Sequence, residues 1–281
     1  MRYIVLVFLY LISFPFLSRL WGRLVKIKKP EGFVKKVISF FSSHYKIDMS
    51  QYSGEITDYD SLASFFTRPL DPEVRPLIND PSMFLSPCDG KISVLESVAA
   101  NIATQVKGRT FKITELLRKE IDLSQGYTLV TIYLSPRDYH RYHVPVGSKA
   151  VSYIQTGWRL YPVNKFSVET VNNLFIKNER VCVKFNSDLG EFFFVAVGAT
   201  FVGSVKMDFY EKAVEGKWIT VNREYSQNHE LGMFEMGSTI VLVIPDKMIG
   251  EIKVKEGDTV KVGEPLFSLK KAEKKSRGNK Q

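Results

Sequence analysis

The tripeptide Gly237-Ser238-Thr239 could carry out chemistry on the chain itself. It stands directly before the apolar run 240–244, near the C-terminal end of the sequence. Gly237 has no Cβ, so its carbonyl can be approached closely and held in conformations that other residues resist. The Ser238 hydroxyl lies one residue away and becomes a nucleophile if a base activates it. Gly-Ser-Thr is also ordinary loop chemistry, so its meaning depends on what accompanies it.

A nucleophilic serine needs a base, and the base needs an orienting acid. Two of the four histidines, His140 and His143, lie within the segment 133–145, directly after a predicted strand. Loop residues in such places often carry function, so this pair supplies the candidate base. The candidate acid is Asp89 in the segment 86–91, although plain turn chemistry explains the same Pro and Gly neighbours.

A metal site is the first alternative for His140 and His143, because His-x-x-His can chelate. No carboxylate follows the pattern of a zinc hydrolase, and no nearby cysteine completes a ligand set, so we expect no metal. The two cysteines, Cys88 and Cys182, are too few for a disulfide framework. We expect both to be small buried residues.

Composition and charge limit the class of partner. With 281 residues, 44% hydrophobic and 13% aromatic, the chain can fold as one large or two modest globular domains. Its net charge of +9 predicts an anionic partner, either nucleic acid or an acidic membrane surface. The basic residues cluster between Leu17 and Val37, after an apolar N-terminus, and no nucleic-acid-binding signature occurs. The membrane surface is therefore favoured, and no nucleic acid is expected.

The apolar N-terminal segment 3–12 is interrupted by Ser13 and Pro15. A secretory signal peptide would need a small-x-small cleavage site, which is missing, and a spanning helix would need a longer unbroken run. We expect a helix lying in the membrane interface, with Trp21 and the basic cluster at head-group level.

The remaining pattern predicts an α+β protein, in which a helical membrane-associating N-terminal segment precedes a β-rich, barrel-like catalytic domain. Helical spacing of apolar residues covers 31–48, and a short helix is expected at Leu62–Phe66. After about residue 84 the chain has few helices, the clearest candidate being Thr114–Lys119. The expected strands are Lys91–Leu95, Tyr127–Leu134, Val181–Phe185, Glu191–Phe201, Trp218–Val221, Thr239–Ile244, Ile252–Val254 and Thr259–Val262.

Six segments together resemble the phosphatidylserine decarboxylase family in its bacterial, pyruvoyl-dependent proenzyme form. They occur in the family's order over roughly residues 60 to 245, and six such motifs in order are highly specific. The segments are 65–70 (FFTRPL), 86–90 (SPCDG), 133–143 (YLSPRDYHRYH), 172–181 (NNLFIKNERV), 197–204 (VGATFVGS) and 231–239 (LGMFEMGST).

The resemblance implies that Asp89, His143 and Ser238 form a self-cleaving triad. His143 would accept the hydroxyl proton while Asp89 holds its tautomer, and Ser238 would attack the Gly237 carbonyl. The resulting ester would undergo β-elimination and hydrolysis, which leaves a covalent pyruvoyl group derived from Ser238. The products would be a β chain (1–237) and an α chain (238–281).

The resemblance also implies the reaction, which converts phosphatidylserine to phosphatidylethanolamine. The pyruvoyl ketone would form a Schiff base with the substrate amine and accept the electrons released with CO₂, so pyridoxal phosphate is not required. His140 would lie beside the substrate carboxylate and assist decarboxylation or the following protonation. The expected partners are phosphatidylserine in an anionic membrane surface and the paired α and β chains, with a higher homo-oligomer left open.

The expected organisation is a membrane-attachment region (1–70), a self-cleaving catalytic domain (71–269) and a basic flexible tail (270–281). The expected location is peripheral, on the cytoplasmic side of the cell membrane. Some positions depart from the family pattern: Met236 replaces a leucine and Cys88 an alanine. Trp158 and Arg159 stand where the family has a shorter Gly-x-Leu arrangement, so the resemblance assigns them no role.

Three other functions compete with this one. A Ser-His-Asp hydrolase would use the same side chains, but the Gly-x-Ser-x-Gly elbow is absent around Ser238. The segment 249–266 is similar to lipoyl and biotinyl carrier domains, with Lys247 as the modified lysine, but its spacing to Gly257 is too compact. A sibling pyruvoyl decarboxylase that acts on another serine-headgroup lipid stays open, because no motif specifies the lipid backbone.

Overall fold

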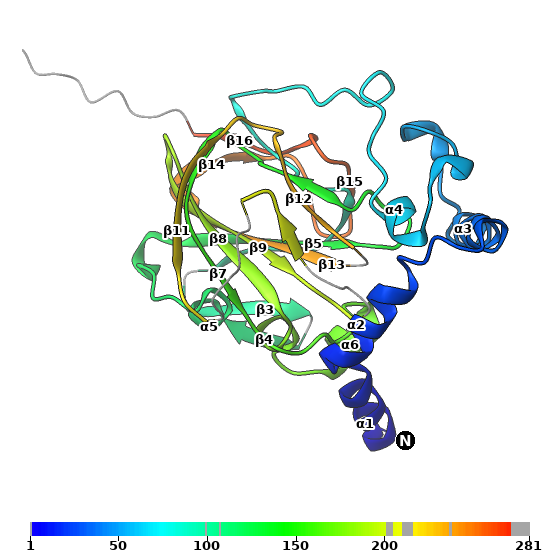
Figure 1. Cartoon of the computed structure of the whole chain (residues 1–281). Helices are drawn as coiled ribbons and strands as arrows, with labels where there is room; N and C mark the ends of the chain where they lie inside the picture. Colours follow the sequence, from blue (N-terminus) through cyan, green and yellow to red (C-terminus); the bar gives the residue numbers. More distant parts are fainter. Residues whose placement is uncertain are drawn as a thin grey trace, which may run out of the picture.

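Helices occupy the N-terminal part of the chain and strands most of the rest, as the computed structural model in Figure 1 shows. The structure describes residues 2–98, 100–106, 108–200, 205–209, 216–235 and 238–270, with side chains from residue 6 onward. The N-terminal helices are α1 (Arg2–Ile12), α2 (Pro15–Leu24), α3 (Glu31–Tyr45) and the short α4 (Leu62–Phe66). The predicted α+β class, with N-terminal helices before a β-rich domain, is confirmed.

The break between α1 and α2 falls where the sequence predicts it. Pro15 is the first residue of α2, a position that needs no backbone N–H. The Ser13 hydroxyl donates to the Tyr10 carbonyl (2.7 Å) at the end of α1. Within the described part of the chain, no helix is both long and apolar enough to cross a membrane.

The main sheet has eight antiparallel strands in the order β11-β7-β8-β9-β13-β5-β2-β15. The edge strands β11 and β15 do not pair with each other, so the described residues form an open sheet and no closed barrel. Its strands are β2 (Gly90–Val98), β5 (Tyr127–Leu134), β7 (Ser148–Thr156), β8 (Arg180–Ser187), β9 (Gly190–Val197), β11 (Ile219–Tyr225), β13 (Ser238–Pro245) and β15 (Thr259–Val260).

Smaller elements surround this sheet. One three-stranded sheet has the order β10-β12-β6, another has the order β1-β16-β14, and β3 pairs with β4. The bounds of these strands are β1 (Met83–Leu85), β3 (Ile102–Val106), β4 (Arg109–Lys112), β6 (Arg141–His143), β10 (Val205–Met207), β12 (Glu230–Phe234), β14 (Ile249–Ile252) and β16 (Pro265–Leu269). The short helices are α5 (Ile113–Leu117), α6 (Lys165–Thr170) and α7 (Leu174–Lys177), with 3₁₀ turns at Met49–Gln51, Ile56–Asp58, Leu123–Gln125 and Asp246–Met248.

Most predicted strands are present, and the errors lie mainly at their ends. The strand predicted at Glu191–Phe201 ends at Val197 as β9, and the one predicted at Ile252–Val254 lies earlier, as β14. The strands β1, β3, β4, β6, β7, β10, β12 and β16 and the helices α6 and α7 were not predicted. The two helices have only 6 and 4 residues, which is too short for helical periodicity to be visible.

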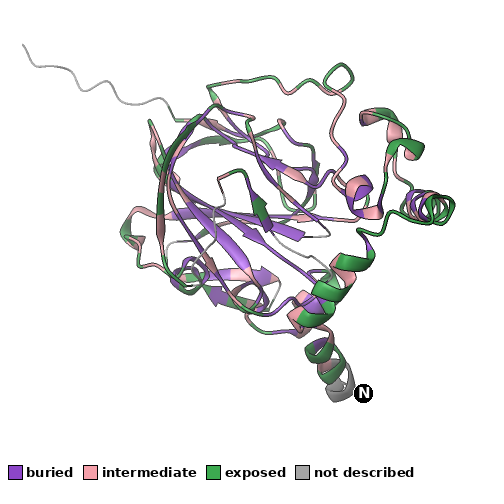
Figure 2. Cartoon of the chain, in the orientation of Figure 1, coloured by how far each residue is buried: buried purple, intermediate pink, exposed green. Residues whose placement is uncertain are grey.

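The core is formed on both faces of β13, whose eight residues are all buried. Ile240, Leu242 and Ile244 join the cluster on one face of the sheet, whereas Val241 and Val243 join the cluster on the other. This alternation is that of a strand covered on both sides. Figure 2 shows the contrast with the N-terminal helices, which are largely exposed.

Arg159 joins the α1–α2 junction to the β-rich domain. The side chain is only 3% exposed, and its guanidinium lies 4.0 Å from the ring centroid of Tyr10 and 3.9 Å from that of Phe14. The Trp158 ring stacks on it as well, also at 3.9 Å. The next backbone N–H, that of Leu160, donates to the Ser13 carbonyl (2.9 Å). The resemblance assigned no role to this residue, and in the structure it contacts the helical segment at the α1–α2 junction.

We predict that Arg159→Ala loosens α1 and α2 from the domain. Each cation–π contact contributes roughly 0.5–2 kcal/mol, so losing the two with Tyr10 and Phe14 should make tryptic cleavage at Arg19 and Arg23 about tenfold faster. The measurement is limited proteolysis followed by mass spectrometry. Arg223→Ala is the matched control, because Arg223 lies over Tyr225 (5.2 Å) on edge strand β11. Equal cleavage rates in both variants would contradict the prediction.

Candidate active site

The register of two strand pairs brings the predicted site residues to one place. Strand β13 pairs with β5 so that Ser238 lies opposite Leu134. Strand β12 pairs with β6, and the Phe234 N–H donates to the His140 carbonyl (2.9 Å). Glu235 and Ser238, the described residues on either side of 236–237, therefore lie near the two ends of the loop 135–139. Met236 and Gly237 themselves lie outside the described residues.

Ser238 is completely buried, and its Oγ has no hydrogen-bond partner among the described residues. It begins β13 and shares a sheet face with Ile240 and the cross-strand Leu134, so its surroundings are apolar. Buried hydroxyls are nearly always hydrogen-bonded, and each exception calls for an explanation. An unpaired hydroxyl at this position is available for chemistry.

His140 is held in one tautomer with one free nitrogen. Nδ1 donates to the Asp138 carbonyl (2.7 Å), so Nε2 carries the lone pair. Nε2 is buried and has no partner in the described structure. Burial, with a smaller contribution from the positive charge of Arg68, lowers the pKa of His140 to about 3. The imidazole is therefore neutral at physiological pH.

His143 is also neutral, but both of its nitrogens are engaged. Nδ1 donates to the Asn228 carbonyl (2.8 Å), and Nε2 accepts from the Tyr139 hydroxyl (3.0 Å). Burial lowers the pKa of His143, although the bond to Asn228 opposes this effect. Nε2 is thus the nitrogen that can act as a base. The backbone N–H of His143 donates to the Pro87 carbonyl (2.7 Å), which fixes the strand beside the Asp89 turn.

Asp89 is anchored by a cation rather than by a histidine. The Arg75 guanidinium donates to both carboxylate oxygens (2.8 and 2.9 Å), and the Val262 N–H donates a third bond (2.8 Å). The negative charge of Asp89 raises the pKa of His143, against the larger effect of burial. The structure therefore places Asp89 near His143, but no direct hydrogen bond joins Asp89, His143 and Ser238 to one another among the described residues.

The Asp89 turn approaches β5 very closely. A Cβ on Gly90 would lie 2.6 Å from the Tyr133 carbonyl oxygen and 2.8 Å from a methyl of Ile132. Only glycine fits there, which gives a physical reason for the Asp-Gly sequence in the predicted motif.

The end of α4 and the residues just after it pack against the loop that carries His140. Arg68 is fully buried and donates to the carbonyls of Arg137 (2.8 Å) and Asp138 (3.4 Å). The ring of Phe66 packs on that of His140, with 4.0 Å between ring centroids. The sequence analysis assigned no roles within the segment 65–70 (FFTRPL). It also did not identify Arg75 or Tyr139 as site residues. An arginine among aromatic residues before a proline was the available signal.

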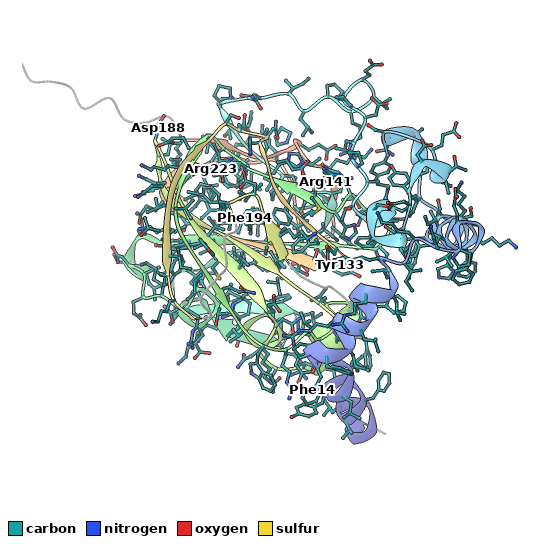
Figure 3. The ribbon with its side chains drawn as sticks, in the orientation of Figure 1. Phe14, Tyr133, Arg141, Asp188, Phe194 and Arg223 are labelled. Atoms are coloured by element: carbon teal, nitrogen blue, oxygen red, sulfur yellow. The ribbon has the colours of Figure 1, made fainter. Side chains whose placement is uncertain are left out.

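Glu235 ties the N-terminal region to the connection before Ser238. Its buried carboxylate forms ion pairs with Lys26 (2.9 Å) and Lys206 (2.6 Å). Burial alone would raise the pKa of Glu235, but the hydrogen bonds from Lys206 and Lys26 outweigh it, so that the pKa is lowered. Figure 3 shows Tyr133 and Arg141 on the side of the β-rich domain that faces the N-terminal helices. The Arg141 side chain donates to the carbonyl of Thr67, the residue after α4 (2.8 Å).

A cavity of about 410 Å³ opens beside Thr239, the second residue of β13. Thr239 and Tyr133 line it on the sheet, and Phe175 adds an apolar wall. Two cations, Lys91 and Lys165, and one carboxylate, Glu256, also line it, so the charged lining is positive by one. This combination suits a molecule with an anionic group and an apolar part.

Comparison with known proteins identifies the family of this chain. The family model described as "Phosphatidylserine decarboxylase" matches residues 62–268. The chain belongs to the phosphatidylserine decarboxylase family. It is 37% identical to the "Phosphatidylserine decarboxylase proenzyme" of Brevibacillus brevis over 250 residues, covering 85% of this chain and 89% of that protein. The proenzymes of Campylobacter jejuni (35% over 263 residues, 89% and 97%) and Escherichia coli (33% over 276 residues, 92% and 85%) are also similar.

Family membership confirms the predicted enzyme, a phosphatidylserine decarboxylase of phospholipid biosynthesis. It favours this activity over the Ser-His-Asp hydrolase and over the carrier domain. Lys247 lies in the 3₁₀ turn Asp246–Met248 between β13 and β14. Cys88 and Cys182 are both buried free thiols whose pKa burial raises, so neither is a reactive thiolate.

We predict that His140→Gln reduces the acid sensitivity of folding. The pKa of His140 lies below its unfolded value, so its contribution to stability is complete above about pH 6.5 and is lost as pH falls toward about 3. Between pH 7 and pH 5 this loss is about 2 kcal/mol, at about 1.4 kcal/mol per pH unit below 6.5. Urea unfolding of uncleaved Ser238→Ala protein, with and without His140→Gln, measures the difference. Identical losses of stability on acidification would contradict it.

Proposed function

We propose that the protein is a proenzyme that cleaves itself between Gly237 and Ser238 and then uses a pyruvoyl group, made from Ser238, to decarboxylate phosphatidylserine. The observation that carries this proposal is the buried Ser238 hydroxyl without a partner, opposite the histidine loop. The relatives named as proenzymes support it. Two chains result, a β chain of residues 1–237 and an α chain of residues 238–281.

In the first step the Ser238 oxygen attacks the Gly237 carbonyl and the peptide C–N bond breaks, so that the acyl group becomes an ester. His143 Nε2 takes the hydroxyl proton and returns it to the amine that leaves. Tyr139 occupies that nitrogen in the present structure, so its hydroxyl moves aside or relays the proton. Asp89 acts through its charge, which favours the protonated state of His143.

In the second step the ester is eliminated. The Cα proton of residue 238 is removed, the C–O bond breaks, and the Gly237 carboxylate leaves as the end of the β chain. Water then hydrolyses the dehydroalanine, which releases ammonia and leaves a ketone at the start of the α chain. The site fits such a group, because Ser238 begins a buried strand and has no hydrogen bond to lose.

The pyruvoyl ketone would supply the electron sink for the carbanion left by CO₂. His140 is assigned to the substrate carboxylate or to the proton that replaces it. Its Nε2 has no hydrogen-bond partner among the described residues. The Asp138 carbonyl accepts from Nδ1 and so fixes the orientation of the ring. The apolar packing of Phe66 against the ring keeps water away from it. The cavity beside Thr239 is assigned to the glycerophosphate part of the lipid, with Lys91 and Lys165 facing the phosphate.

The N-terminal region is assigned to peripheral attachment at the cytoplasmic face of the membrane. Large apolar side chains are exposed along α1, α2 and α3, among them Phe8 (59%), Phe16 (71%) and Phe40 (72%). Lysines and arginines of 19–36 lie among them, which suits an anionic interface. Residues 1–70 are proposed as the attachment region, 71–269 as the catalytic domain and 270–281 as a tail, of which 271–281 lie outside the described residues. The α and β chains are proposed to stay together as a heterodimer.

Ser238→Ala should abolish both maturation and turnover. We expect two bands for the wild type in denaturing electrophoresis and one for the variant, with phosphatidylserine turnover only in the wild type. Ser167→Ala is the matched control, because Ser167 is also fully buried with an unpartnered Oγ, and it should still give two bands. Borohydride or hydroxylamine should inactivate the mature enzyme. A single unmodified chain that turns over lipid would refute the mechanism.

The two histidines should separate cleavage from turnover. We expect His143→Gln to remain largely uncleaved, whereas His140→Gln should mature but lose about 10²–10⁴-fold in kcat, as for the loss of a general acid or base. His229→Gln is the control, since that histidine is 40% exposed in its side chain and contacts Asp208. Electrophoresis and single-turnover kinetics measure the two effects. If His140→Gln blocks cleavage and His143→Gln does not, the assigned roles are reversed.

A further inference from the structure

A second cavity, of about 450 Å³, lies between α1 and the β-rich domain. Leu6, Val7 and Tyr10 of α1 line one side, and Arg109, Tyr161 and Lys177 are among the residues on the other. It shares no lining residue with the cavity beside Thr239. The α1 groove, as we call it, is therefore separate from the site assigned to the substrate.

The polar side of the α1 groove carries two uncompensated positive charges. Arg109 follows the β3–β4 turn, and its Nε donates to the Glu169 carbonyl (2.5 Å). Lys177 is the last residue of α7 and is exposed. Within the described residues neither side chain forms an ion pair with a carboxylate, whereas many other lysines and arginines do. Together they can bind an anion with two or more acceptor oxygens, such as a phosphate diester.

The other side of the α1 groove is apolar and uncovered. Val7 is 57% exposed and Tyr10 is 48% exposed, on a helix whose sequence is almost entirely apolar. The packing of Arg159 against Tyr10 and Phe14 keeps this helix next to the domain, so the groove has two fixed walls. A phosphate beside a long apolar wall is the chemistry of a membrane phospholipid and not of a free anion.

We propose that the α1 groove binds one anionic glycerophospholipid of the membrane, with its phosphate between Arg109 and Lys177 and an acyl chain along α1. The lipid is an accessory ligand that docks the enzyme on its membrane, distinct from the lipid that is decarboxylated. This inference rests on the proposed membrane attachment. It adds a discrete binding site to an otherwise diffuse apolar and basic surface.

The binding test uses phosphatidylcholine vesicles that contain phosphatidylglycerol, an anionic lipid without the serine headgroup. We expect the double variant Arg109→Ala/Lys177→Ala to partition about thirtyfold less than wild type, from about 1 kcal/mol for each lost cation. Arg109→Lys/Lys177→Arg should partition like the wild type. The control Lys217→Ala/Lys255→Ala removes the same charge from two exposed lysines that line neither cavity, and it should lose less than twofold. Equal losses in the two alanine pairs would overturn the proposal.

Photolabelling locates the lipid. Phosphatidylglycerol with a photoreactive acyl chain should label peptides containing Leu6–Tyr10 and 161–177 in the wild type, and these labels should disappear in Arg109→Ala/Lys177→Ala. Labelling elsewhere, or labelling that the double variant leaves unchanged, would overturn the proposal. Displacement of the label by millimolar inorganic phosphate would also overturn it, because the site would then bind a free anion.

Turnover separates this proposal from the proposed function. With dispersed short-chain phosphatidylserine, Arg109→Ala/Lys177→Ala should match wild-type kcat and KM, whereas on vesicles its rate should fall with its partitioning. A loss of dispersed turnover in the variant would place the groove in the substrate site and refute an accessory role. A wild type that turns over no phosphatidylserine would refute the proposed function and leave the labelling result intact.

Discussion

The pairing of β13 with β5, continued by that of β12 with β6, is the constraint on which the site depends. Because antiparallel register fixes which residues face each other, it sets Ser238 against Leu134 and Phe234 against His140. Glu235 and Ser238 must then lie near the two ends of the loop 135–139. A shift of one residue in this register would turn Ser238 to the other sheet face and separate it from the apolar cluster around Leu134.

Burial explains the electrostatics of the site. Both histidines of the loop are kept neutral by desolvation, and each is fixed in its tautomer by a backbone carbonyl. The two carboxylates Asp89 and Glu235 are paired with cations: Asp89 with Arg75, and Glu235 with Lys26 and Lys206. Ser238 Oγ and His140 Nε2 are among the buried atoms without a partner in the described structure, and they lie in an environment where an unmade hydrogen bond is costly.

The sequence sufficed for the family, the β-rich class and the strands with continuous apolar runs. Strand β13 is an example, since Ile240–Ile244 is buried on both faces and needs no alternation to be recognised. Short or mixed elements were missed because their stability comes from partners distant in sequence. Strand β7 mixes lysine and serine with apolar residues and is specified by its neighbours β8 and β11. The same holds at the site for Arg75, which contacts Asp89 across 14 residues of sequence. Tyr139 lies only four residues before His143, but no spacing rule for the loop 135–139 predicts that their side chains meet.

The central position of β13 has a consequence for a chain cut before Ser238. This strand lies between β5 and β9, which would both belong to the larger fragment, and the smaller fragment also contributes β14, β15 and β16 to sheets built on β1 and β2. The smaller fragment could not dissociate without breaking the hydrogen bonds of β13 to β5 and β9 and exposing both hydrophobic clusters. Scission would thus change covalent connectivity while leaving the fold a single cooperative unit, and the two pieces would melt together.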